Sequence, residues 1–303
     1  MASIREIKRR IKSVKNISQV TRAMQMVAAS RMRRAQERAL SSRPYAAKAW
    51  EILTHLAAQG GNVSQLHPLL TSRPQVNNVA IILITAEKGL AGAYNSNVIR
   101  KASQFMRSNS QEQASLITVG RKGRDFMVRF QRKVVAEFAD LPPLPSSLDI
   151  APITRLALDG FLSEEYDEVY LAYTDFINTL VQEPTVRLLL PIRPGDIESK
   201  VMSEYLGSGS PAATTEYLYE PSPAVLLDSL LPRFTELQIY QAVLEARASE
   251  ESARMVAMRN ATDNAKELIS DLTLTYNKVR QDAITKEMLD IAGGAEALAQ
   301  AST

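Results

Sequence analysis

The feature that most limits how this chain can fold is the pair of long helical patterns at its two ends. Apolar residues recur every three or four positions from Ile4 to Val27, and the pattern continues to the glycine pair 60–61. A second such pattern begins after Pro223 and continues to Ala292. At 1.5 Å per residue these helices would reach roughly 80 Å and roughly 100 Å, far beyond the helices of an ordinary domain.

Prolines leave open whether each helix is continuous. Pro44 predicts either a kink in the first helix or the start of a second one, and Pro232 predicts kinked or separate first turns in the other. Ser3 followed by Glu6 fits a capping box, which indicates that the first helix begins there.

Two helices of this length cannot bury their apolar stripes on a small middle domain alone, so we expect an antiparallel coiled coil. Charge favours the pairing. Residues 1–50 hold 13 Lys and Arg against two acids, a balance of +11, whereas residues 224–303 hold 8 basic and 12 acidic residues, a balance of −4. The N-terminal stripe departs from a strict heptad, which predicts an irregular coil.

The middle of the chain predicts an α/β domain with a mostly parallel sheet, because strand and helix patterns alternate there. The predicted strands are 78–85, 115–119, 133–137, 168–174 and 185–190, and the predicted helices are 95–108 and 151–162. Loops are predicted at 141–147 and at 194–216, the second of them mobile. We therefore predict an N-terminal coiled-coil helix at 1–60, an α/β domain at 61–220 and a C-terminal coiled-coil helix at 221–303.

No motif for catalysis stands out. The chain has no cysteine and two histidines, and it lacks the phosphate-loop, dinucleotide, nucleophile-elbow and zinc-protease patterns. The glycine turns 87–92 and 120–123 could approach a ligand, but ordinary strand-to-helix turns explain them better. We therefore expect no catalytic residue, no metal site and no cofactor, although an enzyme using the 87–92 turn stays an alternative.

The basic N-terminal helix suits either a nucleic acid or a protein partner. Its cations could contact phosphates, but Tyr45 and Trp50 are its only aromatic residues, so it has no platform for stacking bases. Met24, Met26 and Val27 give it an adaptable apolar surface that favours a protein. A basic coiled-coil protein that binds nucleic acid is the alternative hypothesis.

Membrane insertion and secretion are not predicted. The longest apolar runs are too short to span a bilayer, and the N-terminus lacks a secretory signal. Its arginine-rich start is similar to an organelle transit peptide, but the helical pattern runs through it without a break, which favours a mature helix.

Several segments resemble the gamma subunits of F-type ATP synthases. The run ISQVTRAMQMVAASRM at 17–32 resembles the N-terminal signature of that family, and six further segments match in order along the chain: 42–45, 218–221, 251–258, 261–265, 276–281 and 284–287.

The resemblance implies a central rotor shaft that couples ion flow through a membrane sector to ATP synthesis or hydrolysis on beta subunits. Such a subunit has a coiled coil and a Rossmann-like basal domain, and carries no catalytic residue itself. Its implied partners are a ring of three alpha and three beta subunits, an epsilon subunit and a ring of c subunits. No nucleic acid is expected, and membrane association arises only through the complex. Lack of cysteine excludes thiol regulation, so a bacterial protein on the cytoplasmic side of the plasma membrane is favoured.

The same resemblance implies particular contact residues. Those facing the alpha/beta ring would be Arg22, Met24, Arg254, Arg280, Gln281 and Thr285. Those facing the c ring and epsilon would be Tyr217, Tyr219 and Glu220.

Overall fold

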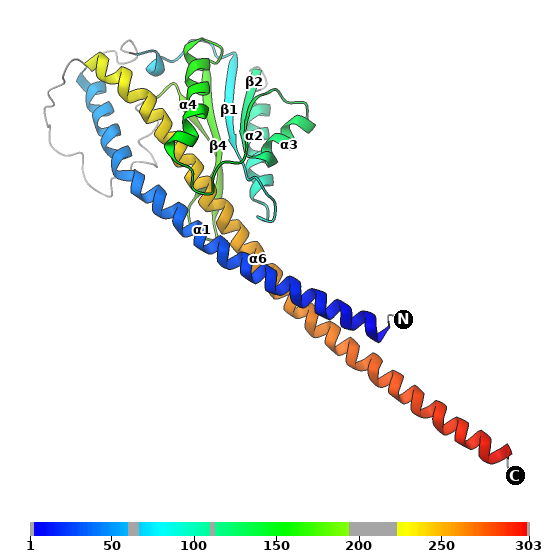
Figure 1. Cartoon of the computed structure of the whole chain (residues 1–303). Coiled ribbons are helices and arrows are strands. Elements are labelled where there is room, and N and C mark those ends of the chain that lie inside the picture. The colour runs from blue at the N-terminus through cyan, green and yellow to red at the C-terminus, as the bar shows by residue number, and fades with distance from the viewer. Residues whose placement is uncertain (1–2, 60–66, 110–112, 194–222, 302–303) are drawn as a thin grey trace. The chain divides into compact units, whose positions relative to one another are not determined.

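The computed structural model describes residues 3–59, 67–109, 113–193 and 223–301 (Figure 1). Its two terminal helices are α1 (Ile4–Gln59) and α6 (Pro223–Ala301), with 56 and 79 residues. Both run without a break through their internal prolines, Pro44 and Pro232, so each predicted helix is continuous. Among the described residues, no helix has an apolar stretch long enough to cross a bilayer.

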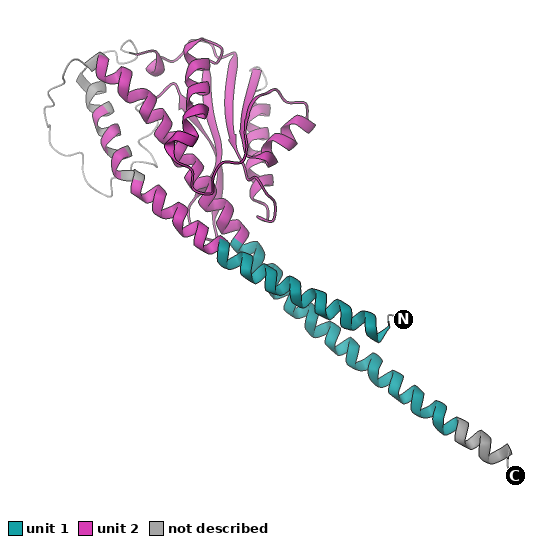
Figure 2. Ribbon diagram, viewed as in Figure 1, with its two compact units in different colours: residues 1–27, 255–303 teal, residues 28–254 magenta. Residues whose placement is uncertain are grey.

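The chain divides into two compact units (Figure 2). Unit 1 combines the start of α1, up to Val27, with the part of α6 from Met255 onward. Unit 2 runs from Ala28 to Arg254 and contains the sheet. The predicted domain boundaries at 60 and 220, and the predicted mobile loop 194–216, lie outside the described residues.

Unit 2 is built on one five-stranded sheet with the strand order β3-β2-β1-β4-β5. The strands are β1 (Asn78–Ile84), β2 (Gln113–Val119), β3 (Val134–Phe138), β4 (Glu168–Phe176) and β5 (Gln182–Leu190). All neighbours are parallel except β4 and β5, which form an antiparallel edge. Every predicted strand is present, and the mostly parallel α/β prediction is confirmed.

Helices cover both faces of this sheet. They are α2 (Tyr94–Ser108), α3 (Arg121–Arg129) and α4 (Ser147–Leu162), and a single 3-10 turn, η2 (Pro68–Leu70), precedes β1. The predicted helix 151–162 begins four residues earlier than expected, because the Ser146 amide donates to the Asp149 carboxylate at 2.7 Å and caps the first turn. Helix α3 was not among the predicted helices.

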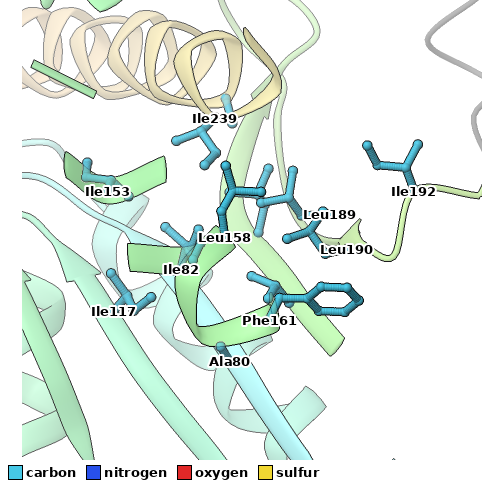
Figure 3. Close-up of a cluster of buried hydrophobic side chains, with 14 of the residues drawn as sticks. Ala80, Ile82, Ile117, Ile153, Leu158, Phe161, Leu189, Leu190, Ile192 and Ile239 are labelled. Carbon is cyan, nitrogen blue, oxygen red and sulfur yellow. The ribbon is translucent and has the colours of Figure 1, made fainter. Parts of the chain in front are cut away.

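The central strand β1 is buried on both faces, which explains its unbroken apolar run. Val79, Ile81 and Leu83 pack with α2 and Met127 of α3. Ala80, Ile82 and Ile84 point to the opposite face, where α4 and the first part of α6 complete a larger core. Figure 3 shows part of that core, in which Ile82 lies among side chains from α4, β5 and α6.

Candidate partner interface on the terminal helices

In unit 1, α1 and α6 lie side by side and run in opposite directions (Figure 2). Ile7, Met258 and Ala265 are buried in this pair. A buried hydroxyl pair sits among them, with the Oγ1 atoms of Thr21 and Thr262 2.7 Å apart. The antiparallel pairing predicted from the two apolar stripes is therefore present.

The threonine pair fixes which residues of the two helices face each other. Each threonine hydroxyl also reaches a carbonyl of its own helix, Ser18 at 3.1 Å and Met258 at 2.8 Å. A hydroxyl carries one proton, so one threonine donates across the pair while the other donates to its own helix, and a shifted register would lose the bond between the helices.

We expect Thr262→Val to destabilise the helix pair by about 1 kcal/mol, because it leaves the Thr21 hydroxyl buried without its partner on α6. The double variant Thr21→Val/Thr262→Val should be more stable than the sum of the two single changes predicts, by about 0.5–1.5 kcal/mol. Urea unfolding followed by circular dichroism measures all four proteins. Strictly additive effects would show that the two hydroxyls do not interact.

The register also determines which part of α6 lies beyond the N-terminal end of α1. Ser3 lies 18 positions before Thr21, and in the antiparallel pair this corresponds to the stretch of α6 from Thr262 to about Arg280. Beyond that point no described residue of α1 lies opposite α6, and every residue from Arg280 to Gly293 is exposed. Exposed apolar side chains gather in this stretch: Ile284 (49%), Met288 (65%), Leu289 (66%) and Ile291 (67%).

Three of the predicted ring contacts lie on this unpaired part of α6. Arg280, Gln281 and Thr285 are all exposed, within a turn and a half of one another. On α1, Arg22 is exposed and Met24 is half-buried. Four apolar residues of the same part of α1 are at least half exposed: Ile17, Val20, Met26 and Val27. The paired helices therefore present an apolar surface with scattered cations, which fits a protein partner.

Arg254 has a different setting, because it lies buried in unit 2 within a group of ion pairs. Its guanidinium donates to Glu250 at 2.5 Å and contacts Glu251 at 2.9 Å. Arg247 also pairs with Glu250 at 3.0 Å, and Arg31 of α1 reaches Glu251 at 3.6 Å. A partner carboxylate could engage Arg254 only by competing with its own two glutamates.

Burial would lower the pKa of Arg254, but the adjacent Glu250 and Glu251 outweigh it and raise the pKa. Tyr94 of α2 packs against the same group, and burial followed by the charge of Glu250 raises its pKa as well. Sequence reasoning missed this group, although the i, i+4 spacing of Glu250 and Arg254 was a usable signal.

The two glycine turns are held by contacts within the chain. In the turn after β1, the Glu87 carboxylate accepts from the Asp140 amide at 2.9 Å and from the Arg121 amide at 3.4 Å. Gly120 caps the start of α3 with a positive φ of 92°. These contacts support the interpretation of both segments as strand-to-helix turns. Tyr217, Tyr219 and Glu220 lie outside the described residues.

Comparison with known proteins gives a consistent result over the whole chain. A family model described as ATP synthase matches residues 3–298. An ATP synthase gamma chain from Dehalococcoides mccartyi is 50% identical over 299 residues, which cover 99% of this chain and 100% of the relative. One from Roseiflexus castenholzii is also 50% identical, over 302 residues, with the same coverage.

Solved structures show the same fold. The rotor of the Euglena gracilis mitochondrial ATP synthase superposes with a TM-score of 0.60 at 19% identity, covering 93% of this chain and 98% of that one. A chain of the Tetrahymena thermophila central stalk and c ring gives a TM-score of 0.56 at 23% identity, covering 80% of this chain and 99% of that one.

Proposed function

This chain belongs to the ATP synthase gamma-chain family, and we propose that it works as the central rotor shaft of an F-type ATP synthase. As a gamma chain it is a non-catalytic subunit of that complex, with its partners inside ATP synthase. The observation that carries the proposal is full-length identity of 50% to bacterial gamma chains, together with a paired-helix unit that ends in an exposed, unpaired stretch of α6.

The proposed mechanism is mechanical. The alpha/beta ring would surround the paired helices, and the two helices present different side chains in different directions around their common axis. Turning such an asymmetric shaft presents a different surface to each catalytic beta subunit, which shifts the populations of that subunit's conformations. One charge crossing 100 mV supplies roughly 2.3 kcal/mol, so several ions per turn deliver tens of kcal/mol to the shaft.

The proposed contacts to the ring are Arg22, Met24, Arg254, Arg280, Gln281 and Thr285. The last three gain support from their exposure on the unpaired part of α6. Arginine and glutamine can bond to carboxylates and carbonyls of a surrounding subunit, whereas methionine slides without a fixed geometry. For Arg254 the proposed contact includes an exchange of ion pairs, because Glu250 and Glu251 already hold its guanidinium.

The other proposed partners are an epsilon subunit and a ring of c subunits, which would meet the α/β part of the chain. Tyr217, Tyr219 and Glu220 are the residues proposed for that contact. Association with the cytoplasmic face of a bacterial plasma membrane would then arise through the complex. Because the chain belongs to this family, we prefer the rotor function to the nucleic-acid hypothesis. Part of the positive charge of α1 is also paired with acidic residues of the same helix, as in the Arg10–Glu6 ion pair at 2.7 Å.

ATP hydrolysis by purified alpha and beta subunits, measured with and without this chain, tests the proposal. We expect a stoichiometric complex with markedly higher turnover. Arg280→Ala or Gln281→Ala should weaken the assembly by more than about 1 kcal/mol, or about fivefold, if these side chains are central contacts.

Lys286→Ala is the matched control for those two variants. Lys286 is also exposed on α6, but it points at least about 120° around the helix from both Arg280 and Gln281. Absence of any complex between competent alpha and beta subunits and the folded chain would contradict the shaft proposal. Equal effects of all three substitutions would contradict the specific contacts.

A further inference from the structure

A groove runs between α2 and α3, which lie next to each other on one face of the sheet (Figure 1). Both helices follow parallel strands, β1 and β2, so they run in the same direction. The groove has a volume of about 600 Å³, within the range of ~300–1,000 Å³ that is typical of binding sites. Ser96 and Ser103 of α2 line it, and their short side chains fill little of it.

The floor and one wall of this groove are apolar. Ile99 of α2 and Met127 of α3 are its two buried lining residues, 6% and 1% exposed, and so form the floor. Phe126 and Phe130 of α3 lie beside them with their ring centres 4.5 Å apart, and they stay 37% and 59% exposed. Two exposed phenyl rings next to a buried aliphatic floor form a site into which apolar side chains of a partner can pack.

Cations surround the apolar floor, and no carboxylate lines the groove in the described part of the chain. The four cations are Arg100, Arg107, Lys122 and Arg132, and all of them are exposed. None of the four forms an ion pair with an acidic residue that the structure describes. The groove is therefore open to carboxylates from outside the chain.

Two neighbouring arginines of α3 differ, because acidic residues of the chain already pair with them. Arg124 pairs with Asp125 at 2.7 Å and also with Glu137, and Arg121 pairs with Asp140. The segment as a whole still keeps an excess of positive charge. Residues 94–133 hold nine Lys and Arg against two acids, a balance of +7, whereas the whole chain carries +3.

The length of the groove indicates what kind of segment fits it. It follows α2 from Asn95 to Arg107, and 12 steps of 1.5 Å give roughly 18 Å, or about three turns of helix. An amphipathic helix places apolar side chains every three or four residues along one face, which is the pattern that such grooves bind. The surrounding cations favour acidic residues beside those apolar positions.

We propose that the groove between α2 and α3 binds an acidic amphipathic helix of a protein partner. Apolar side chains of that helix pack on Phe126 and Phe130, and its carboxylates pair with the surrounding cations. A lipid bilayer suits the groove less well, because Ile99 and Met127 lie at the bottom of a hollow that a membrane surface does not enter. The test uses this chain without alpha and beta subunits, so its outcome is separate from that of the rotor proposal.

A designed helical peptide of about 15 residues is the probe. It carries leucine at positions i, i+4, i+7 and i+11, glutamate beside them and alanine elsewhere, and its twin carries lysine in place of every glutamate. Fluorescence anisotropy of each labelled peptide, titrated with the full chain, measures Kd. We expect the acidic peptide to bind at least about tenfold more tightly than its twin, and the difference to shrink as salt is added.

Charge reversal locates the binding site, which is necessary because α1 is basic as well. Arg100→Glu should weaken binding of the acidic peptide by at least about fivefold and strengthen binding of the lysine twin. Lys101→Glu is the matched control, since Lys101 is exposed at the next position of α2 but does not line the groove. It should change either Kd by less than about twofold.

A second pair of variants tests the apolar part of the site. Phe126→Ala should weaken binding of the acidic peptide by at least about fivefold, because it removes a ring on which the leucines pack. Val128→Ala is the matched control, since Val128 is 57% exposed on α3 and does not line the groove. All four substituted positions are exposed, and circular dichroism checks that each variant stays folded.

Three results would overturn the proposal. The first is equal binding of the two peptides, or equal effects of Arg100→Glu and Lys101→Glu on the acidic one. The second is no saturable binding of the acidic peptide up to about 1 mM. The third is binding to phosphatidylglycerol vesicles that Arg100→Glu and Phe126→Ala abolish and that the acidic peptide does not displace, because the groove would then belong to a membrane contact.

Discussion

Gly120→Ala is expected to destabilise unit 2 by at least about 3 kcal/mol, because a methyl group at this position meets backbone atoms that cannot move away. Gly120 follows directly after β2 with a φ of 92°, in the left-handed region that L side chains rarely adopt. An added Cβ would lie 2.2 Å from the carbonyl oxygen of Thr85 and 2.9 Å from its carbonyl carbon. Strain at the positive φ adds roughly 1–2 kcal/mol to the cost of this clash.

Thr85 is held by hydrogen bonds of both its amide and its hydroxyl, which is why the clash cannot relax cheaply. Its amide donates to the Val119 carbonyl at 2.8 Å, which joins the ends of β1 and β2. Its hydroxyl accepts from the Gly123 amide at 2.8 Å, in the first turn of α3. Moving Thr85 would therefore break contacts between two strands and the start of a helix.

Gly89→Ala is the matched control, because Gly89 has no positive φ and an added Cβ would meet nothing within 4 Å. It should stay within about 0.5 kcal/mol of the unchanged chain. Urea unfolding at pH 7, followed by circular dichroism, compares the two variants. A Gly120→Ala chain within 1 kcal/mol of the unchanged protein would show that the Thr85 backbone can yield.

The sheet could be predicted from sequence because its strands carry a local signal. β1 is an unbroken apolar run, since its alternate residues face two different cores. Helix α3 carries no such signal: five of its nine residues are charged and Gly123 lies inside it. It forms because the Gly123 amide is tied to Thr85, which is 38 residues away in the sequence. A pattern search over one segment contains no information about such a contact.

The candidate interface shows the same limit. Periodicity predicted that the terminal helices pair, but the residues that face each other depend on a buried hydroxyl pair separated by 241 residues. Only that register shows that Arg280, Gln281 and Thr285 lie beyond the N-terminal end of α1.

Burial separates Arg254 from the other predicted contacts, and the i, i+4 spacing to Glu250 indicates an ion pair but not this burial. In the sequence it is one of several arginines on a long helix, whereas in the structure it is 9% exposed and paired with Glu250 and Glu251. An arginine in this position helps to hold unit 2 together, and the proposed ring contact would require it to exchange its two glutamates for a partner carboxylate. Its substitution would therefore mix stability with function, and Arg280 and Gln281 are the cleaner tests of the interface.

Asp167→Ala is expected to cost about 3–5 kcal/mol, because Asp167 is a nearly buried carboxylate that joins the starts of β1 and β4. Its Oδ2 accepts from the amides of Asn77 and Asn78 at 2.9 Å and 2.8 Å. Its Oδ1 accepts from Arg73 at 2.7 Å, and Arg73 in turn donates to the Phe161 carbonyl at 2.8 Å. Alanine would leave two amides and a guanidinium without their acceptor.

The pH dependence of this site distinguishes a lost carboxylate from a merely disturbed loop. Burial alone would raise the pKa of Asp167, but hydrogen bonds from Asn78, Arg73 and Asn77 outweigh it and lower the pKa below its ordinary 3.8. A lowered folded pKa means that the contribution is complete above pH 3.8 and is lost as the pH falls through the folded value. The unchanged chain should therefore lose stability in that acid range, and Asp167→Ala should lose less.

Asp159→Ala is the matched control, because Asp159 is exposed on α4 and should change stability by less than about 0.5 kcal/mol. Asp167→Asn should fall between the two, since its amide oxygen keeps one acceptor but its nitrogen faces groups that only donate. Urea midpoints at pH 7, together with acid unfolding of all four proteins, provide the comparison. Equal acid sensitivity with and without the Asp167 carboxylate would mean that its hydrogen bonds do not stabilise the folded chain. In that case the joined strand starts would have to be held by the backbone bond from the Asp167 amide to the Asn78 carbonyl, at 2.8 Å, and by the β1–β4 pairing that follows it.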